Sequence, residues 1–187
     1  MPSVLVIYAT DYGNTKAMAD AIVEGVRSVS GVTATLKTAE EATYHDINDH
    51  DALVLGTPVH MGSPDWRVKK FIDTQCSGVW MGDTAVGKVG AVFGTGSGFG
   101  NAGGGIEMTL LALLNNLAEL GMLLVPLPKN TPGYTHAGLQ WGPYGRTGDE
   151  KLNPIGLKPE HLIAARAHGA NVARVTAAVA GKKLLGG

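Results

Sequence analysis

A short polar segment directly after an apolar stretch is the part of this sequence best suited to bind a ligand. Residues 4–8 read Val-Leu-Val-Ile-Tyr, the pattern of a strand buried on both faces, and residues 18–26 then carry apolar side chains at the three- and four-residue steps of a helix. The polar segment between them adds hydroxyl and amide groups to the backbone amides that a helix leaves free at its start. We therefore predict a phosphate site here. Its residues are Thr10, Asp11, Tyr12, Gly13, Asn14 and Thr15.

A glycine-rich loop is the second candidate binding segment. Glycine is concentrated at residues 94–105, between a predicted strand and a predicted helix. Residues 98–103 match the G-x-G-x-x-G pattern, but the match falls late in the chain and no carboxylate follows where a ribose would need one. We favour a backbone that comes close to a flat ligand, with a plain flexible loop as the alternative. The residues concerned are Thr95, Gly96, Ser97, Gly98, Gly100, Gly103 and Gly104.

The elements that must position these segments alternate between strands and helices. Further strands are predicted at residues 32–37, 51–56, 88–95 and 122–126, and further helices at 65–73, 106–120 and 159–180, with 38–49, 75–87 and 127–157 as connections. This alternation predicts an α/β fold, a parallel sheet with helices on both faces, in which ligands bind beyond the carboxyl ends of the strands.

Three loops leave those strand ends, at residues 9–15, 57–64 and 94–105. A five-stranded sheet of order 2-1-3-4-5 would bring them together, so we predict that order. The middle loop contributes Pro58, Val59, His60, Met61 and Gly62 to the expected site.

Composition restricts the class of protein. The 187 residues suit a single domain, residues 1–187, and contain no apolar run long enough for a membrane span. The chain starts directly in a strand and has one cysteine, which together favour a cytoplasmic protein without a disulfide. The net charge of −1 gives no indication of nucleic-acid binding, and it also lacks the strong acidity of a dedicated electron shuttle.

Other residues that could do chemistry have simpler interpretations. The run at 82–88 resembles a P-loop but precedes a strand and lacks the metal-binding hydroxyl. The histidines and aspartates at 45–51 lack metal-ligand spacing, so we predict no metal site. Cys76 is expected to be structural, and Trp66 to lie on the buried stripe of its helix. Trp80 and Tyr144 lie in predicted connections, where an aromatic either packs a loop onto the core or lines a pocket.

With these residues identified, the chain resembles the flavodoxin-like superfamily, and within it the tryptophan-repressor-binding-protein (WrbA) family of FMN-dependent NAD(P)H:quinone oxidoreductases. The resemblance covers nearly the whole chain. It rests on residues 4–8 with Tyr12-Gly13, Gly56-Thr57-Pro58, Gly62, Phe71-Ile72-Asp73 before Trp80, residues 88–93, the glycine-rich loop, Gly121-Met122 before Val125-Pro126, and Gly142-Pro143-Tyr144-Gly145.

The resemblance implies a flavodoxin-like three-layer sandwich that binds FMN and transfers two electrons from NAD(P)H to quinones. By position, the family's phosphate loop falls on residues 10–15, its loop along the isoalloxazine on 59–61, and its loop at the pyrimidine end on 95–105. Tyr12 matches a residue associated with the nicotinamide nucleotide and Trp80 one that shapes the substrate pocket. The family is typically tetrameric, so a homodimer or homotetramer is expected.

The chain departs from the family at functional positions. His60 stands where the family often has an arginine, and Leu120 where it often has a histidine over the flavin. We therefore assign no catalytic residue, and an electron-transfer flavodoxin that carries single electrons between proteins is the alternative. A flavin-holding protein without turnover is a third possibility.

Overall fold

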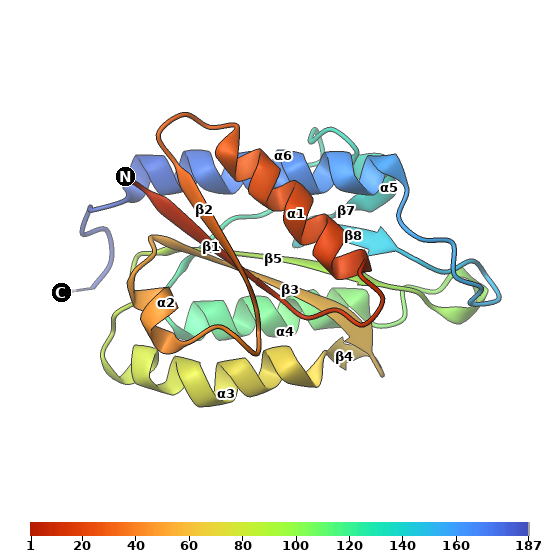
Figure 1. Cartoon of the computed structure of the whole chain (residues 1–187), viewed down its shortest axis with the longest axis horizontal. Coiled ribbons are helices and arrows are strands. Elements are labelled where there is room, and N and C mark those ends of the chain that lie inside the picture. The colour runs from red at the N-terminus through yellow and green to blue at the C-terminus, as the bar shows by residue number, and fades with distance from the viewer. Residues whose placement is uncertain (187) are drawn as a thin grey trace.

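The computed structural model describes residues 1–186. The chain folds into a mostly parallel sheet with helices on both faces (Figure 1). The strands are β1 Ser3–Tyr8, β2 Thr33–Thr38, β3 Ala52–His60, β4 Ser63–Pro64, β5 Val89–Gly96, β6 Leu123–Leu124, β7 Gly138–Leu139 and β8 Gly142–Arg146. The helices are α1 Asn14–Arg27, α2 Tyr44–Asn48, α3 Trp66–Met81, α4 Ile106–Glu119, α5 Tyr134–Ala137 and α6 Pro159–Val179, with a short 3₁₀ helix at Phe99–Asn101.

The strand order confirms the predicted fold class and refines the fifth position of the sheet. The order is β2-β1-β3-β5-β8-β7, with β6 paired to β5 and β4 paired to β3. β6 pairs only with the start of β5, at Val89 and Gly90, and β8 pairs with its end at Gly94–Gly96, both in parallel. The predicted strand at 122–126 is present as the short β6, and β8, from the predicted connection 127–157, completes this position of the sheet.

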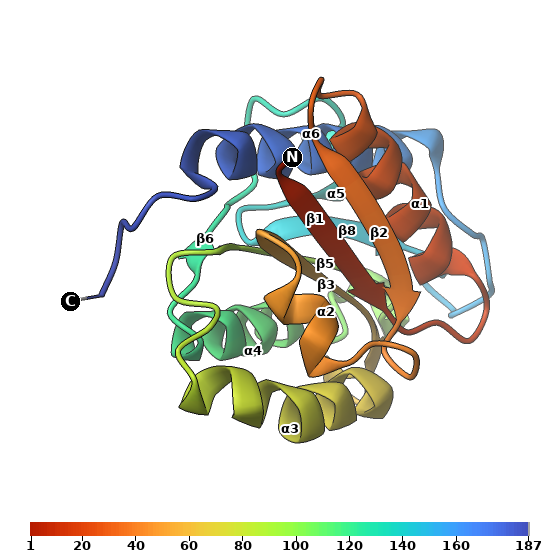
Figure 2. The same ribbon diagram turned by 60° about the vertical axis from the view of Figure 1, so that its left-hand side comes forward.

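Alternation along β1 divides the core into two layers. Leu5 and Ile7 pack into a cluster with residues of α3 and α4, whereas Val4 and Val6 pack with residues of α1 and α6. Figures 1 and 2 show the same arrangement, with α1 and α6 on one face of the sheet and α3 and α4 on the other (Figure 2). Both faces of β1 are buried, as its continuous apolar sequence predicts.

Helices α1 and α6 approach each other closely through glycine. A Cβ atom at Gly25 would lie 1.9 Å from the carbonyl oxygen of Arg166, and one at Gly169 would lie 2.1 Å from the carbonyl oxygen of Ile22. Only glycine fits at these two positions, because no real Cβ approaches a backbone atom so closely. The contact fixes α1, and therefore the loop that precedes it, against the C-terminal helix.

Helix α3 is longer than predicted. The expected connection at 75–87 is helical as far as Met81, and Trp80 therefore lies on a helix. Val68, Phe71 and Ile72 are buried as predicted, but Trp66 is 63% exposed and does not belong to the core. The buried Asp65 caps the helix immediately before Trp66, so the inward position at this end is held by a carboxylate instead of the indole.

No helix within residues 1–186 is long and apolar enough to cross a membrane. The two longest helices, α3 and α6, have 16 and 21 residues and are both amphipathic elements of the sandwich.

His168 is a fully buried histidine on the inner side of α6. Its exposed fraction is 0%, and neither ring nitrogen has a hydrogen-bond partner among the described residues. Burial lowers the pKa of His168 to about 4 from its ordinary value of 6.5, because the charged ring has lost its water.

We predict that this histidine makes the protein sensitive to acid. Between pH 6.5 and 4 only the unfolded chain takes up the proton, so about 3 kcal/mol of folding free energy is lost across that range. Urea denaturation of His168→Leu should show higher stability at pH 7 by about 1 kcal/mol and a gain that grows as the pH falls. His45→Leu, at an exposed position, is the control. A gain that stays constant with pH would contradict the prediction.

Candidate functional site

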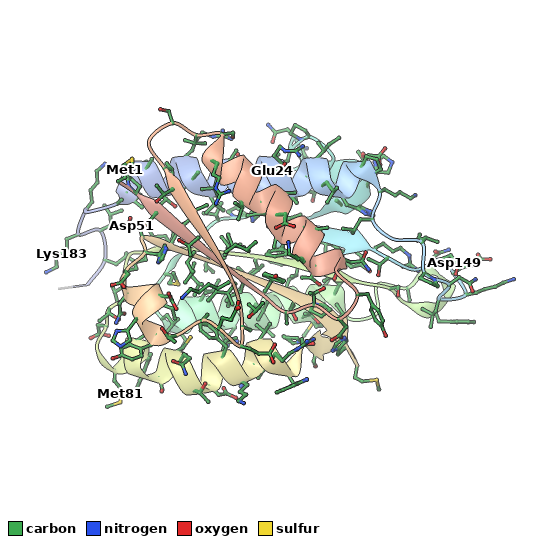
Figure 3. The ribbon with its side chains drawn as sticks, viewed as in Figure 1. Met1, Glu24, Asp51, Met81, Asp149 and Lys183 are labelled. Atoms are coloured by element: carbon green, nitrogen blue, oxygen red, sulfur yellow. The ribbon has the colours of Figure 1, made fainter. Side chains whose placement is uncertain are left out.

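The candidate site lies where the parallel strands end. Asp149, on the loop after β8, marks this end of the molecule, and Met1 and Lys183 lie at the opposite end (Figure 3). β1 ends at Tyr8 and α1 begins at Asn14. Gly13 between them has a φ of 82°, a conformation that favours glycine.

The first loop presents free donors at the start of a helix. The amide of Gly13 donates to Thr10 Oγ1 over 3.0 Å, which closes the turn. No side chain of the described residues caps α1. The first backbone amides of α1 therefore have no acceptor within the helix, and they are free to bind an anion that the helix dipole would also stabilise.

A buried hydroxyl pair joins the first loop to the end of β5. Thr15 Oγ1 and Thr95 Oγ1 lie 2.7 Å apart, and the two residues are 1% and 2% exposed. These threonines are 80 positions apart in sequence, so the bond shows directly that the first and third predicted loops meet. One hydroxyl donates to the other, and the accepting hydroxyl keeps its own proton for a further partner.

The second loop is a projecting hairpin and not the irregular loop expected at 57–64. β3 continues to His60, and the chain then turns through Met61 at φ 49° and Gly62 at φ 75° into the antiparallel β4. Met61 is fully exposed at the tip, with a relative accessibility of 101%. The hairpin places His60 beside the first loop.

Four ionisable side chains link the first and second loops. Arg67 Nη2 lies 2.7 Å from an oxygen of Asp11 and 2.7 Å from an oxygen of Asp65. Arg67 Nη1 donates to the carbonyl oxygen of Thr10 over 3.3 Å. The two ring nitrogens of His60 lie 3.2 Å from Asp11 and 3.0 Å from Asp65. We call these four residues, Asp11, His60, Asp65 and Arg67, the interloop cluster.

Asp65 is the buried member of the interloop cluster. Its side chain is 0% exposed, and its Oδ1 accepts from the amide of Arg67 over 2.8 Å at the start of α3. Burial alone would raise the pKa of the Asp65 carboxyl, but hydrogen bonds from Arg67 outweigh burial and hold that pKa below its ordinary value. The hydrogen bond to Asp65 in turn raises the pKa of Arg67, so both groups stay charged.

The interloop cluster also has ligand atoms for a metal. One atom each from Asp11, His60 and Asp65 lies within 4.8 Å of the others. Arg67 already pairs with both carboxylates and supplies the positive charge that an ion would bring. The arrangement is therefore an ion-pair network, and we assign no metal to it.

The glycine-rich loop packs directly on the hairpin. Gly105, the residue before α4, has a φ of 95°, and a Cβ atom there would lie 2.6 Å from Cα of Gly62. Backbone meets backbone at this point, so the need for glycine at Gly105 comes from the hairpin, and the close approach to a flat ligand stays a prediction.

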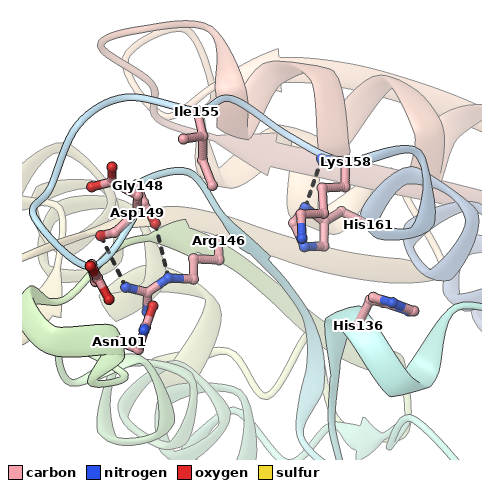
Figure 4. A pocket seen from close by; sticks show the side chains of 9 residues that line it. Asn101, His136, Arg146, Gly148, Asp149, Ile155, Lys158 and His161 are labelled. Atoms are coloured by element: carbon pink, nitrogen blue, oxygen red, sulfur yellow. Dashed lines mark hydrogen bonds between the residues drawn. The ribbon is translucent and has the colours of Figure 1, made fainter.

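Arg146 holds the glycine-rich loop in place from β8. Its Nε donates to the carbonyl oxygen of Gly148 over 2.9 Å, its Nη1 to that of Ala102 over 2.9 Å, and its Nη2 to that of Gly98 over 2.7 Å. Figure 4 shows Arg146 beneath the loop that carries Asp149, at the edge of a cavity of about 440 Å³. Arg146 therefore ties two loops to the sheet.

The three loops form one cleft of about 180 Å³, as the predicted strand order requires. This volume is smaller than that of pockets which enclose a whole cofactor, so the cleft suits one end of an elongated ligand. Its lining residues are Thr10, Asp11, Tyr12, Asn14, Thr15, Pro58, Val59, His60, Thr95, Gly96, Ser97 and Thr147.

Several predicted site residues lie outside this cleft. Gly103, Gly104 and Tyr144 line a neighbouring cavity of about 540 Å³. The hydroxyl of Tyr144 donates to the carbonyl oxygen of Gly96 over 2.9 Å, which supports the cleft from beneath. The remaining predicted residues that do not line the cleft are Gly13, Met61, Gly62, Gly98 and Gly100.

Trp80 lies in a separate groove between α3 and α4. The groove has a volume of about 220 Å³ and is also lined by Cys76 and Leu120. Burial raises the pKa of the Cys76 thiol to about 12, so this cysteine is not a ready nucleophile, as expected for a structural residue. The two positions at which the resembled family places substrate-pocket and flavin-facing residues, Trp80 and Leu120, therefore lie together and apart from the cleft.

Sequence reasoning missed Asp65, Arg67 and Thr147. Asp65 could have been found, because an aspartate immediately before a predicted helix is a capping residue and is drawn inward with that helix. Arg67 and Thr147 carry no local pattern, since their partners lie far away in sequence.

Comparison with known proteins agrees with this geometry. Residues 5–79 match the model of the flavodoxin domain. The structure is similar to that of a WrbA-like flavodoxin from Agrobacterium tumefaciens, with 27% identity, a TM-score of 0.71, and coverage of 96% of this chain and 99% of that chain. It is also similar to a flavodoxin from the domain Archaea, with 20% identity, a TM-score of 0.63, and coverage of 94% and 99%. A flavodiiron protein from Giardia intestinalis matches at 15% identity and a TM-score of 0.66, with coverage of 95% of this chain and 36% of that chain.

The chain therefore has a flavodoxin-like fold, and residues 5–79 match the model of the flavodoxin domain, which describes a class of FMN-binding flavoproteins. The expectation of FMN as cofactor is confirmed at this level. The residues present fit FMN. Free helix amides and two buried hydroxyls meet in the cleft, and the backbone of the glycine-rich loop borders it.

We predict that the contact between the glycine-rich loop and the hairpin needs a glycine. Gly105→Ala places a methyl group against Gly62 in a conformation that L-residues rarely adopt, and should lower the free energy of unfolding by about 1–3 kcal/mol. Gly103→Ala, in the same loop, would meet only the side chain of Ile106 at 3.5 Å and should be tolerated. Equal urea midpoints for the two variants would contradict the prediction.

Proposed function

We propose that this protein binds FMN in the cleft and acts as an oxidoreductase that passes two electrons from NAD(P)H to a quinone. The observation that carries the proposal is the convergence of three loops at the uncapped start of α1. The similarity to a WrbA-like flavodoxin over nearly the full length of both chains supports the choice of reaction.

The phosphate of FMN would bind to the first loop without a lysine or arginine. Lys16, the nearest basic residue in sequence, pairs with Asp20 over 2.8 Å on the exposed side of α1. Stabilisation of the anion would instead come from the first amides of the helix and from the side chains of Thr10, Asn14 and Thr15. Such a site is formed by hydrogen bonds of fixed direction.

The other two loops would hold the ring system. Val59, His60 and Met61 would lie along the ring, and the backbone of residues 95–104 would border its pyrimidine end, where amides stabilise negative charge. Bound FMN supplies the chemistry of hydride and electron transfer, and the protein supplies position and electrostatics. Tyr12, which is 92% exposed at the rim, is free to contact the nicotinamide nucleotide.

We further propose a single-domain, cytoplasmic protein that assembles as a homodimer or homotetramer. Trp80 and Leu120 line a groove outside the cleft of their own chain. A role for Trp80 in substrate binding therefore requires a second copy of the chain to bring it to the cleft.

An electron-carrying flavodoxin is the second candidate, because solved flavodoxins share the fold. The net charge of −1 does not favour it, since carriers that dock basic partners gain from strong acidity. A potentiometric titration separates the two functions. A carrier takes up its two electrons at well-separated potentials, whereas a two-electron enzyme takes them up together.

We expect the purified protein to be yellow, to release FMN on denaturation, and to lose its flavin absorbance when mixed anaerobically with NADH or NADPH. Stopped-flow absorbance measures this reaction, and recovery of the absorbance on addition of a quinone completes the test. A protein that binds FMN but is not bleached by either nucleotide would exclude the oxidoreductase and leave the carrier.

We predict that Thr15→Val weakens FMN binding. The variant loses one hydroxyl at the phosphate end, and one hydrogen bond to a charged group corresponds to a loss on the order of tenfold in affinity. Thr176→Val is the matched control, because Thr176 is equally buried but donates to the carbonyl oxygen of Val172 within α6. Isothermal titration of FMN into the apoprotein measures both, and equal affinities would contradict the assignment of the phosphate loop.

A further inference from the structure

One member of the phosphate loop has the wrong charge for its proposed ligand. Asp11 lies between Thr10 and the start of α1 and lines the cleft, where a carboxylate would repel a phosphate. The Asp11 carboxylate has partners on both oxygens, since Asp11 Oδ1 faces Arg67 at 2.7 Å and Asp11 Oδ2 faces His60 at 3.2 Å.

We infer that Arg67 is a positioning residue that sets the phosphate loop for its anion by holding Asp11 and the carbonyl of Thr10 against the start of α3. The inference rests on the proposed function, because it concerns the phosphate end of FMN. Arg67 reaches the loop from another element, so its role is to orient the donors of residues 10–15.

The anchor of this contact is rigid. The side chain of Asp65 is 0% exposed and that of Arg67 is 14% exposed. Two atoms of the guanidinium, Nε at 2.8 Å and Nη2 at 2.7 Å, donate to the two oxygens of Asp65. This two-point bond fixes the plane of the guanidinium, so the same Nη2 and the remaining Nη1 meet the first loop in a defined direction.

A second arginine in the chain shows what the interloop cluster adds. Arg166 on α6 also donates from Nε and Nη2 to a carboxylate, that of Glu24 on α1. Its side chain is 51% exposed and that of Glu24 is 58% exposed, so this pair is screened by water and contributes little. Arg166 is thus a matched control for loss of a guanidinium–carboxylate pair away from the cleft.

Two flavins that differ only in the phosphate, FMN and riboflavin, allow this role of Arg67 to be tested. FMN uses the first loop and riboflavin, which lacks the phosphate, does not. A disordered phosphate loop should therefore weaken FMN binding and leave riboflavin binding nearly unchanged. A purely structural role for Arg67 would weaken both equally, so the ratio of the two affinities reports positioning specifically.

The experiment measures dissociation constants of apoprotein for FMN and for riboflavin by flavin fluorescence, in the wild type, Arg67→Gln and Arg166→Gln. We expect Arg67→Gln to reduce the FMN-to-riboflavin affinity ratio on the order of tenfold or more, as for loss of charge-assisted hydrogen bonds. Arg166→Gln should leave the ratio unchanged. An unchanged ratio in a folded Arg67→Gln protein overturns the inference.

Arg67→Gln leaves the buried Asp65 carboxylate without its guanidinium partner and can unfold the chain. Substitutions at Asp11 avoid this, because Asp65 keeps Arg67. Asp11→Ala removes the tether and should lower the ratio, whereas Asp11→Asn keeps an oxygen for Arg67 and should retain it. Equal ratios for these two variants also overturn the inference. If the wild type binds neither flavin, both the proposed function and the inference fail. If the wild type binds FMN but the variants keep its FMN-to-riboflavin affinity ratio, only the inference fails.

Discussion

The carboxylate of Asp65 is an ionised group from which water is excluded. The arrangement around the cleft depends on the side chains that balance its negative charge. A buried charge without a partner lowers the free energy of unfolding by roughly 3–5 kcal/mol. Here the compensation comes from Arg67, two residues further along the same helix, and from His60 on the hairpin. Because the same guanidinium also reaches Asp11, satisfying one buried acid fixes the relative position of two loops that the sheet only brings near each other.

The sheet provides the coarse placement on which this network acts. Parallel strands send their connections to the same edge, and the order β2-β1-β3-β5 puts the ends of β1, β3 and β5 side by side. The hydroxyl pair of Thr15 and Thr95 and the contact of Gly105 with Gly62 then close the space between the three loops. Donors of three different kinds, helix amides, hydroxyls and loop amides, thus border one cleft whose described lining residues include no lysine or arginine.

The sequence predicted the parts of this structure that depend on local pattern. Apolar strands, the helix starts and the glycine-rich loop each have a signature within a few residues, and the convergence of the loops followed from the expected strand order. The predicted helix at 65–73 is shorter than α3. Thr74, Gln75 and Gly78 look like a connection, although Cys76 and Val79 continue the buried stripe.

The remaining errors concern elements that exist only through tertiary contacts. β8 has the sequence Gly-Pro-Tyr-Gly-Arg, which has poor strand propensity, and it is a strand because it pairs with the end of β5. Arg67 and Arg146 were invisible as site residues for the same reason, since their acceptors are carbonyls and carboxylates that the fold brings from elsewhere. Trp66 was expected inside because it is apolar and correctly spaced, but the capping carboxylate occupies that place.

The close contact of α1 and α6 has a consequence for how the chain is made. These helices belong to the two ends of the sequence, and Glu24 and Arg166, which join them, are 142 positions apart. During synthesis β1, α1, β3 and β5 are made before α6, and the face of the sheet that carries Val4, Val6 and Phe93 is covered only in part, by α1, until α6 emerges. This layer is therefore complete only once α6 has been made, and a nascent or truncated chain that lacks α6 exposes apolar surface to chaperones and to other unfinished chains.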